Sequence, residues 1–366
     1  MIILAIETSC DETAIAVLKI SNGKFEILSD IVASQIKIHA PWGGVVPNLA
    51  KREHERNLPI VLKKALKKAG FVNSNFQFSN SKIDLIAVTV GPGLEPALWT
   101  GINFAKDLAE KWKKPLVGIN HMEGHIFSVL LNSKNKIIFP ALALLVSGGH
   151  TELVLISAKG GPASGWKYKV IGQTRDDAAG EAFDKVAKML GLPYPGGPEV
   201  AKLASKSDVD ATSTSDFKLK LPRPMINSKD YDFSFSGLKT AVLYLLKDLR
   251  AGKFGSRIIS LGARDKENQL SRPLVAQICR EFQQAVIDVL ISKTIRAAKE
   301  YKTKTVILGG GVAANKELRK QLGNKTNLLI PEFKFTTDNA AMIAVAAYFH
   351  AKDKLKNLQA NGNLEL

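Results

Sequence analysis

Two short polar turns of the same form, one in each half of the chain, constrain its fold most strongly. The first, Ser9 to Thr13, separates the apolar stretches Met1–Ile6 and Ala14–Ile20, and the second, Ser147 to Thr151, divides Leu142–Ile156 in the same way. Both turns read Ser-x-x-x-Thr. Short apolar runs on both sides of a polar turn are typical of a hairpin of buried strands. The repetition therefore indicates duplicated lobes whose turns face each other and bind a phosphate through backbone N–H groups; two unrelated hairpins are the alternative.

Predicted strands alternate with predicted helices along the rest of the chain. This alternation indicates an α/β fold, and 366 residues are more than one hydrophobic core usually holds, which favours two lobes. The further predicted strands are Phe25–Ile31, Ile83–Val90, Pro115–Ile119 and Thr305–Leu308. The predicted helices are Pro47–Ala69, Ala97–Trp112, His121–Leu131, Asp177–Leu190, Gly237–Arg250, Leu274–Tyr301, one from Ala314, and Asn339–Lys352. Ser205–Ser215 and Ala251–Arg272 are expected to be loops, and the C-terminal residues are expected to fray.

The balance of charges is strongly basic. The chain carries 51 Lys and Arg residues against 34 Asp and Glu residues, a net charge of +17. Such an excess suits a polyanionic partner such as RNA, because each neutralised phosphate releases counterions; a basic surface that is merely solvated is the alternative. The candidate RNA-contacting stretches are Lys63–Lys68, Lys111–Lys114 and Lys247–Arg257.

The composition also indicates the compartment. The sequence holds two widely separated cysteines, no apolar run long enough to cross a membrane, and no basic leader at its start. Two such cysteines do not form a disulfide framework, and a reducing compartment suits them. We therefore expect a cytoplasmic protein without a membrane partner.

A pair of histidines, His121 and His125, indicates a metal site. Four positions apart on a helix, they share one face and could bind one metal ion together; a buried or surface pair without metal is the alternative. A third ligand must come from elsewhere, and Asp338, expected at the N-cap of the last helix, is a candidate. Met122 stands where a zinc protease of the His-Glu type has its glutamate, which argues against proteolysis.

Two glycine-containing turns could bring backbone close to a ligand. Gly309–Gly311 follows a predicted strand and precedes a helix, whose N-terminus attracts anions, and Asn315 could hydrogen-bond a ribose or base. Pro195–Pro198 is a rigid turn that could do the same. An ordinary turn is the alternative in both cases.

Three acidic residues could take part in chemistry. Asp184 belongs to an acidic helix start, where it could hydrogen-bond a hydroxyl or amine of a substrate, although acids also favour helix starts for electrostatic reasons. Asp11 and Glu12 lie in the first Ser-x-x-x-Thr turn, where a carboxylate could orient water or a metal. Simple turn formation is the alternative for this pair.

An ordered set of motifs runs through almost the whole chain. It comprises Ile6–Thr13, Gly43–Pro47, Gly91–Gly93, His121–His125, Val146–Thr151, Asp177–Lys185, Tyr194–Pro198, Asp232–Thr240, Gly310–Asn315 and Thr337–Met342. Together these motifs resemble the tRNA N(6)-adenosine threonylcarbamoyltransferase family, formerly described as O-sialoglycoprotein endopeptidases. The His-Met-Glu-Gly-His and Ser-Gly-Gly-His forms are similar to those of the bacterial and organellar branch.

The resemblance implies an architecture and a metal site. The implied fold is a two-lobed actin-like or Hsp70-like ATPase (ribonuclease H-like) fold, with residues 1–135 and 336–366 in one lobe, residues 136–335 in the other, and the active site in the cleft between them. One divalent metal ion, iron or zinc, is expected on His121, His125 and Asp338. The archaeal and eukaryotic branch has a Tyr ligand where Leu145 stands, so three protein ligands are expected here.

The resemblance also implies substrates and partners. Asp11 and Glu12 are the candidate catalytic residues, and ATP or ADP can occupy the same cleft as the substrate. The implied partners are tRNA, a paralogous inactive actin-like subunit and a small P-loop ATPase. The residues expected to hold threonylcarbamoyl-adenylate are Leu145, Val146, Ser147, Gly148, Gly149, Asp184, Gly197 and Asn315.

The expected reaction transfers the threonylcarbamoyl group from this adenylate to the N6 amine of the adenosine 3′ of the anticodon, in tRNAs that read ANN codons. The alternatives are a small-molecule O-carbamoyltransferase of the same fold and a non-catalytic RNA- or nucleotide-binding scaffold; a metalloprotease is least favoured. The chain departs from the family pattern at Glu95-Pro96, where a small apolar pair is usual, and in a longer connector from Ala251 to Ser271.

Overall fold

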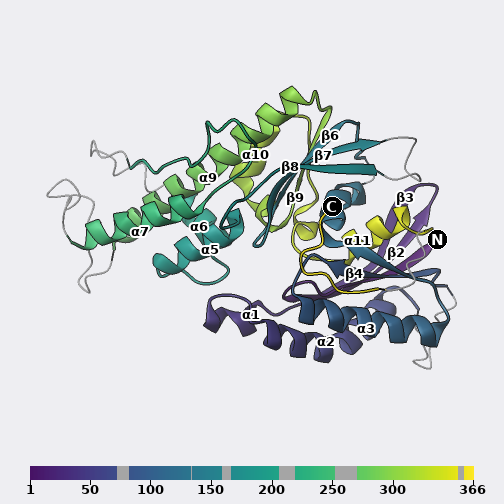
Figure 1. Cartoon of the computed structure of the whole chain (residues 1–366). Helices are drawn as coiled ribbons and strands as arrows, with labels where there is room; N and C mark the ends of the chain where they lie inside the picture. Colours follow the sequence, from purple (N-terminus) through teal and green to yellow (C-terminus); the bar gives the residue numbers. More distant parts are fainter. Residues whose placement is uncertain (72–81, 133, 159–165, 206–218, 252–269, 353–357) are drawn as a thin grey trace.

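The computed structural model describes residues 1–71, 82–132, 134–158, 166–205, 219–251, 270–352 and 358–366. Within them, two five-stranded sheets form the centres of two halves of the molecule (Figure 1). Their strand orders are β3-β2-β1-β4-β5 and β8-β7-β6-β9-β10. In each sheet the first three strands of the order pair antiparallel. The third strand, β1 or β6, also pairs in parallel with the fourth, and the fourth pairs in parallel with the fifth. This shared order confirms the duplicated α/β lobes that the two similar turns predicted.

The strands are short, as their apolar runs indicate. The first sheet contains β1 (Ile2–Glu7), β2 (Glu12–Ser21), β3 (Lys24–Ser34), β4 (Leu85–Gly91) and β5 (Leu116–Asn120). The second contains β6 (Ala141–Val146), β7 (Thr151–Ala158), β8 (Trp166–Gln173), β9 (Thr305–Gly309) and β10 (Leu328–Leu329).

Helices cover both faces of the first sheet. Successive side chains of a strand point to opposite faces, and on β1 Leu4 and Ile6 pack against α2 (Pro47–Lys68) and α3 (Glu95–Trp112). Ile3 and Ala5 pack on the other face, against α11 (Ala340–Phe349). A helix near the end of the chain therefore completes the core of the N-terminal sheet.

The second sheet is also covered on both faces. On β6, Leu142 and Leu144 pack in a large apolar cluster with α5 (Ala179–Met189), α6 (Gly196–Ala204), α7 (Ser236–Arg250) and the long helix α9 (Arg272–Glu300). Ala141, Ala143 and Leu145 face α4 (His121–Phe127), which follows directly from the first sheet. Helix α4 thus packs between the two halves. The remaining helices are α1 (Ile36–His39), α10 (Lys316–Gly323) and the 3-10 turns Ala40–Trp42, Ser128–Leu131, Gly311–Ala314 and Phe333–Phe335.

Several sequence predictions were wrong in detail. Strand β8 and helix α6 were not predicted, because β8 exposes much of its length and α6 begins within a Pro-Gly-Gly-Pro segment read as a turn. The α-helix predicted to run to Leu131 ends at Phe127 and continues as a 3-10 turn. Most of the predicted loops Ser205–Ser215 and Ala251–Arg272 lie outside the described residues.

The predicted fraying of the C-terminal residues is wrong for 358–366. The N–H of Asn361 donates to the carbonyl of Val90 at 2.9 Å, and the carbonyl of Gly362 accepts from the N–H of Gly93 at 3.1 Å. Leu358 is only 6% exposed and packs with the core between α3 and the first sheet. Leu366 packs against the cluster that α4 shares with the second sheet. The segment is held by backbone bonds and apolar burial, which the polar sequence around it does not reveal.

Candidate active site

The two histidines lie one turn apart at the start of α4. Strand β5 ends at Asn120, whose side-chain oxygen accepts a hydrogen bond from the N–H of Met122 at 2.8 Å and so caps the helix. His121 and His125 therefore point to the same side, with ring centroids 4.6 Å apart. The helix and the shared face were predicted from the spacing of the two residues, and both are confirmed.

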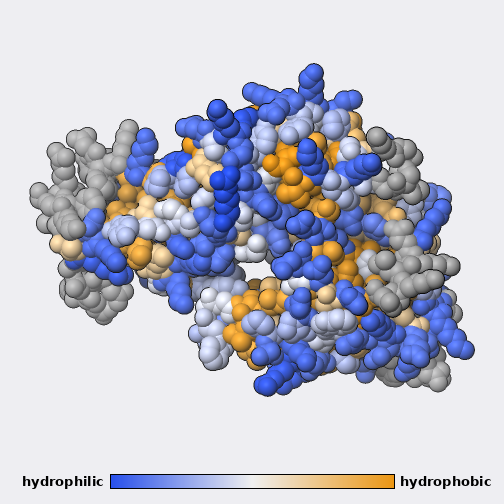
Figure 2. Space-filling view, in the orientation of Figure 1, coloured by the Kyte–Doolittle hydropathy of each residue, from blue (hydrophilic) through white to orange (hydrophobic). Residues whose placement is uncertain are grey.

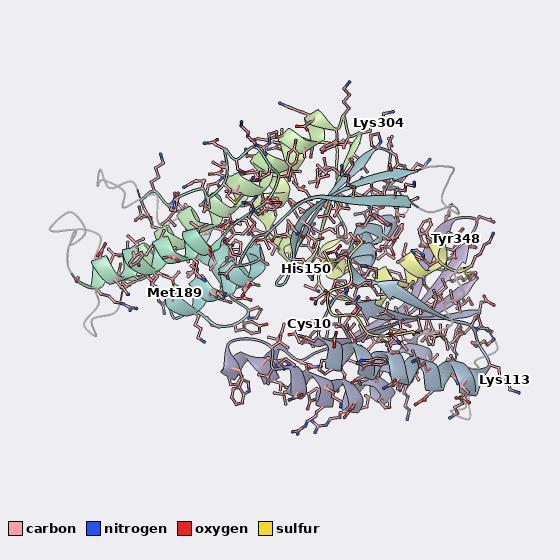
Figure 3. The ribbon with its side chains drawn as sticks, in the orientation of Figure 1. Cys10, Lys113, His150, Met189, Lys304 and Tyr348 are labelled. Carbon is pink, nitrogen blue, oxygen red and sulfur yellow. The ribbon has the colours of Figure 1, made fainter. Side chains whose placement is uncertain are left out.

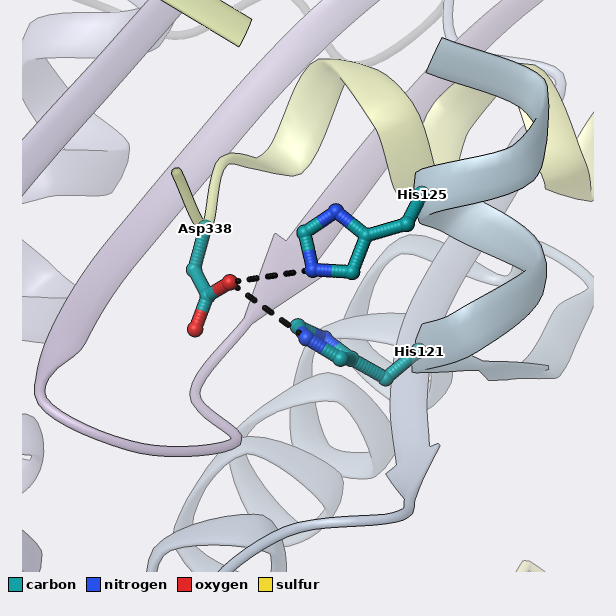
Figure 4. A group of neighbouring side chains, drawn as sticks. All are labelled: His121, His125 and Asp338. Carbon is teal, nitrogen blue, oxygen red and sulfur yellow. Dashed lines mark ion pairs between the residues drawn. The ribbon is translucent and has the colours of Figure 1, made fainter. Parts of the chain in front are cut away.

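Asp338 reaches both imidazoles. Its Oδ1 lies 3.3 Å from Nε2 of His121 and 3.4 Å from Nε2 of His125 (Figure 4). The predicted N-cap role of Asp338 is wrong, because the side chain of the next residue, Asn339, caps α11 by accepting from the N–H of Met342 at 3.0 Å. The cap at Asn339 leaves the carboxylate of Asp338 free to face the histidines.

The chemistry of this group fits a divalent metal ion. One ligand atom from each of the three residues lies within 4.8 Å of the others, and two imidazoles with a carboxylate are donors that zinc and iron accept. His125 is buried, and neither of its ring nitrogens has a hydrogen-bond partner among the described residues. Buried polar atoms normally have partners. A bound cation would provide one for Nε2.

The electrostatics of the group are dominated by its own charges. Burial lowers the pKa of His121, but the carboxylates of Asp338 and Glu7 outweigh it and raise that pKa well above its ordinary value. Burial raises the pKa of Asp338, and the two histidines more than reverse this effect, so that the carboxyl group is strongly acidic. Asp338 is therefore ionised, as a metal ligand must be.

A buried carboxylate behind His121 was missed by sequence reasoning. Glu7, the last residue of β1, is fully buried, and its Oε2 lies 3.0 Å from Nδ1 of His121. The available signal was a single acidic residue at the end of an apolar strand, a position where an unpaired charge is costly.

The side of the metal group next to β6 is apolar. Leu145 is fully buried, and its side chain lies beside Gly309, close to the backbone of His125. A leucine side chain cannot bind a metal. Among the described residues, the group that could hold a metal contains the three predicted residues, and their binding of a metal stays a prediction.

The two similar turns face each other. Cys10 of the β1–β2 turn and His150 of the β6–β7 turn lie on opposite sides of the space between the halves (Figure 3). The space-filling view shows an open hollow there (Figure 2). Ser147 Oγ accepts from the N–H groups of Gly149 and His150 at 3.3 and 3.1 Å, which fixes the second turn. A Cβ on Gly148 or Gly149 would meet no atom within 4 Å, so this backbone is open to a ligand.

The acidic pair of the first turn is held close to the second half. Burial, followed by the charge of Asp11, raises the pKa of Glu12 to about 10. The charge of Asp11 also adds to the burial that raises the pKa of Asp184 on α5. These carboxyl groups therefore share one electrostatic environment, and Glu12 holds a proton at neutral pH.

Other predicted ligand residues make internal hydrogen bonds. Asn315 caps α10 by accepting from the N–H of Leu318 at 3.0 Å, and its amide donates to Gln283 at 2.7 Å. Gly197 lies in the first turn of α6, where an added Cβ would meet only the Cβ of Phe183, at 3.9 Å. Contacts of these residues and of Leu145–Gly149 with a substrate stay predictions.

The basic stretches lie at helix ends. Lys63–Lys68 forms the last residues of α2, Lys111–Lys114 spans the end of α3, and the described part of Lys247–Arg257 spans the end of α7. Their contact with RNA stays a prediction. Among the described residues, no helix is long and apolar enough to cross a membrane.

Comparison with known proteins identifies a family that this chain matches. The family model of the tRNA N6-adenosine threonylcarbamoyltransferases matches residues 26–345. A protein of that name from Thermosipho africanus is 47% identical, with 100% of this chain and 98% of the relative aligned. One from Bacillus subtilis is also 47% identical, over 94% of this chain and 89% of the relative.

Solved structures share the fold at low sequence identity. HypF from T. kodakarensis aligns with a TM-score of 0.53 and 14% sequence identity. The alignment covers 97% of this chain and 49% of the HypF chain. A full-length HypF in a phosphate- and nucleotide-bound form has a TM-score of 0.52 and 12% identity, over 98% of this chain and 56% of its own. With the two sheets, these likenesses confirm the predicted actin-like architecture.

Proposed function

The chain belongs to the family of tRNA N6-adenosine threonylcarbamoyltransferases, as its motifs predict, and we propose a specific reaction for it. It transfers the threonylcarbamoyl group of threonylcarbamoyl-AMP to the N6 amine of the adenosine 3′ of the anticodon, in tRNAs that read ANN codons. In this step the amine nitrogen bonds to the carbamoyl carbon, the carbon–oxygen bond to the phosphate breaks, and AMP and one proton leave.

The proposal is carried by the His–His–Asp group, whose histidines are buried at the start of α4, the helix that packs between the two halves. His121, His125 and Asp338 would hold one divalent ion, iron or zinc. When bound, such an ion supplies Lewis-acid polarisation of an oxygen. The chain itself supplies position, because α4 and the segment before α11 bring the three residues together beside the first turn, where Ser9 Oγ lies 3.2 Å from Nδ1 of His121.

The residues of the two turns would bind and orient the adenylate. The open backbone at Gly148 and Gly149 can approach a phosphate closely. Protonated Glu12 can donate a hydrogen bond, while Asp11 can accept the proton of the attacking amine. ATP or ADP would occupy the same space, since each carries the same nucleotide.

The proposed partners follow from the substrate and the family. The net charge of +17 suits tRNA. We also propose the paralogous inactive actin-like subunit and the small P-loop ATPase as partners. Since its substrate would be tRNA, we place the protein in the cytoplasm.

The test is mass spectrometry of nucleosides from a tRNA with adenosine at the target position. The tRNA is incubated with the protein, threonylcarbamoyl-AMP and the partner subunits, with and without a chelator. A threonylcarbamoyl adduct that disappears on chelation and returns with added zinc or iron is expected. An intact adenylate without adduct in any sample would refute the proposed reaction and favour a small-molecule carbamoyl transfer or a binding role.

A further inference from the structure

We infer that Glu7 is the positioning residue of the metal site: its carboxylate holds His121 in the orientation and tautomer that turn Nε2 toward Asp338. This inference rests on the proposed metal site and concerns a residue that does not itself face the metal. It assigns different support to the two histidines, which the sequence presents as equivalent.

Three donors converge on Glu7. Its Oε2 accepts a hydrogen bond from Thr89 Oγ1 at 2.6 Å and lies 3.0 Å from Nδ1 of His121, while its Oε1 accepts from the N–H of Ser9. An ionised carboxylate only accepts hydrogen bonds. The ring nitrogen that faces it must therefore carry a proton, so only Nε2 is left to bind a metal.

The burial of Glu7 indicates that its carboxylate has a specific function. It is fully buried at the end of β1, where the preceding residues Ile3 to Ile6 are all apolar and buried. Placing a carboxylate in such surroundings is unfavourable unless both of its oxygens accept hydrogen bonds. An apolar residue would suit the strand better, so the carboxylate is explained by the groups that it binds.

His125 has no comparable support. It is 1% exposed, yet its Nδ1 has no hydrogen-bond partner among the described residues. Its ring contacts that of His121, and its Nε2 faces Asp338 at 3.4 Å, but no group among the described residues supports it from the Nδ1 side. Metal ligands commonly donate their second ring nitrogen to a carboxylate or carbonyl, and loss of that partner weakens metal binding. In this site that support is found at His121, whose Nδ1 lies 3.0 Å from the carboxylate of Glu7 and 3.2 Å from the neutral hydroxyl of Ser9.

A purely structural role for Glu7 makes a different prediction. Its bond to the N–H of Ser9 helps to shape the β1–β2 turn, and Thr89 ties it to β4. If this were its only role, a substitution would lower the stability of the metal-free protein and leave metal affinity unchanged. The two roles are therefore separated by measuring both quantities.

The experiment compares Zn²⁺ affinity, measured by competition with a chromophoric chelator, in the wild type and Glu7→Gln. Glutamine keeps the size of the side chain and removes its charge. We expect about 10- to 100-fold weaker Zn²⁺ binding, and an altered visible absorption spectrum of the Co²⁺-loaded protein. Thr13→Val is the matched control. Thr13 is a buried residue that, like Glu7, faces Nδ1 of a buried histidine, here His54 at 2.8 Å, which is not one of the proposed metal ligands. Its substitution should leave Zn²⁺ affinity unchanged.

A second variant keeps the test decisive if Glu7→Gln does not fold. Thr89→Val removes one hydrogen bond from Glu7 and retains the carboxylate, and we expect a several-fold loss of Zn²⁺ affinity that exceeds any loss in Thr13→Val. Zn²⁺ affinity within twofold of wild type in whichever variant folds would overturn the inference. A wild type that binds neither Zn²⁺ nor Co²⁺ would instead overturn the proposed metal site, and the inference with it.

Discussion

Asp184 on α5 accepts a hydrogen bond of 2.7 Å from the N–H of Gly196, the first residue of α6. Sequence reasoning gave Asp184 either a substrate to bind or a helix start to stabilise, whereas the structure shows that its carboxylate joins two helices. The N–H of Gly197 contributes to the same acceptor. Asp184 thus fixes the start of α6, and so the backbone that would approach an adenylate.

Asp184→Ala should destabilise the protein. The variant leaves the first N–H groups of α6 without their acceptor, and loss of a side-chain cap costs about 1–2 kcal/mol. Urea unfolding followed by circular dichroism measures the change. The control is Glu199→Ala, because Glu199 of α6 is 3.9 Å from Lys202 in an exposed pair and should change stability by less than about 0.5 kcal/mol. Equal stability of Asp184→Ala and wild type would contradict the capping role.

The adjacent glycines Gly196 and Gly197 should respond differently to alanine. A Cβ at Gly196 would lie 2.3 Å from the Cβ of Ala187 and 2.9 Å from the Cα of Asp184, whereas one at Gly197 would meet only Phe183 Cβ, at 3.9 Å. Gly196→Ala should therefore lower the thermal midpoint by several degrees, and Gly197→Ala should not. Because Gly197→Ala keeps the fold, weaker adenylate binding in that variant, measured by calorimetry, would report on ligand approach. A Gly196→Ala protein as stable as Gly197→Ala would contradict the close packing of α5 and α6.

Asp30 should make stability fall as pH rises through the acidic range. Burial raises its pKa from 3.8 to about 6, although Lys68 and the N–H groups at the start of α11 offset part of this effect. Below pH 3.8 the carboxyl group is protonated in both the folded and unfolded protein. Between pH 4 and 6 the unfolded form ionises first, so stability falls, by up to about 3 kcal/mol, and then stays level. Asp30→Asn should lack this loss.

The measurement is the difference in unfolding free energy between Asp30→Asn and wild type at several pH values from 4 to 7.5. Taking the difference removes contributions from other titrating groups. The difference should grow in favour of the variant as pH rises from 4 to 6. A difference that is constant over this range would show that Asp30 keeps its ordinary pKa.

Leu358→Ala should show how much the C-terminal segment contributes to the core. Its side chain is 6% exposed and lies against Gly118 and Val90, so truncation leaves a cavity and costs about 2–3 kcal/mol. Leu243→Ala on α7 is the control, since Leu243 is 36% exposed. Stability is measured by urea unfolding. Similar small changes in both variants would mean that residues 358–366 are not held as described.

Much of the fold could be predicted because its cues are local. The apolar strands of both hairpins, the Ser-x-x-x-Thr turns and the one-turn spacing of His121 and His125 are each written within a few residues. Strand β8 was missed because Lys167 and Lys169 face solvent at the sheet edge and leave no long apolar run. Edge strands with charged residues are ordinary in native sheets.

The parts of the site that could not be predicted depend on distant contacts. Glu7 and His121 are far apart in the sequence, and only the pairing of β1, β4 and β5 brings them together. Asp338 was placed at a helix cap because Asp and Asn are both good caps, and only the structure shows that Asn339 serves instead. The hydrogen bond from α6 to Asp184 could not be predicted, because α6 itself was missed: its Pro-Gly-Gly-Pro start reads as a turn.

The packing of α11 and residues 358–366 against the first sheet has a consequence for synthesis on the ribosome. Strands β1, β2 and β4 emerge early, but the helix that covers the Ile3 and Ala5 face of β1 is among the last parts to be made. The elements of the second sheet are complete in sequence before then. Until translation is nearly finished, one apolar face of the first sheet therefore stays uncovered. During that time it can aggregate or bind chaperones.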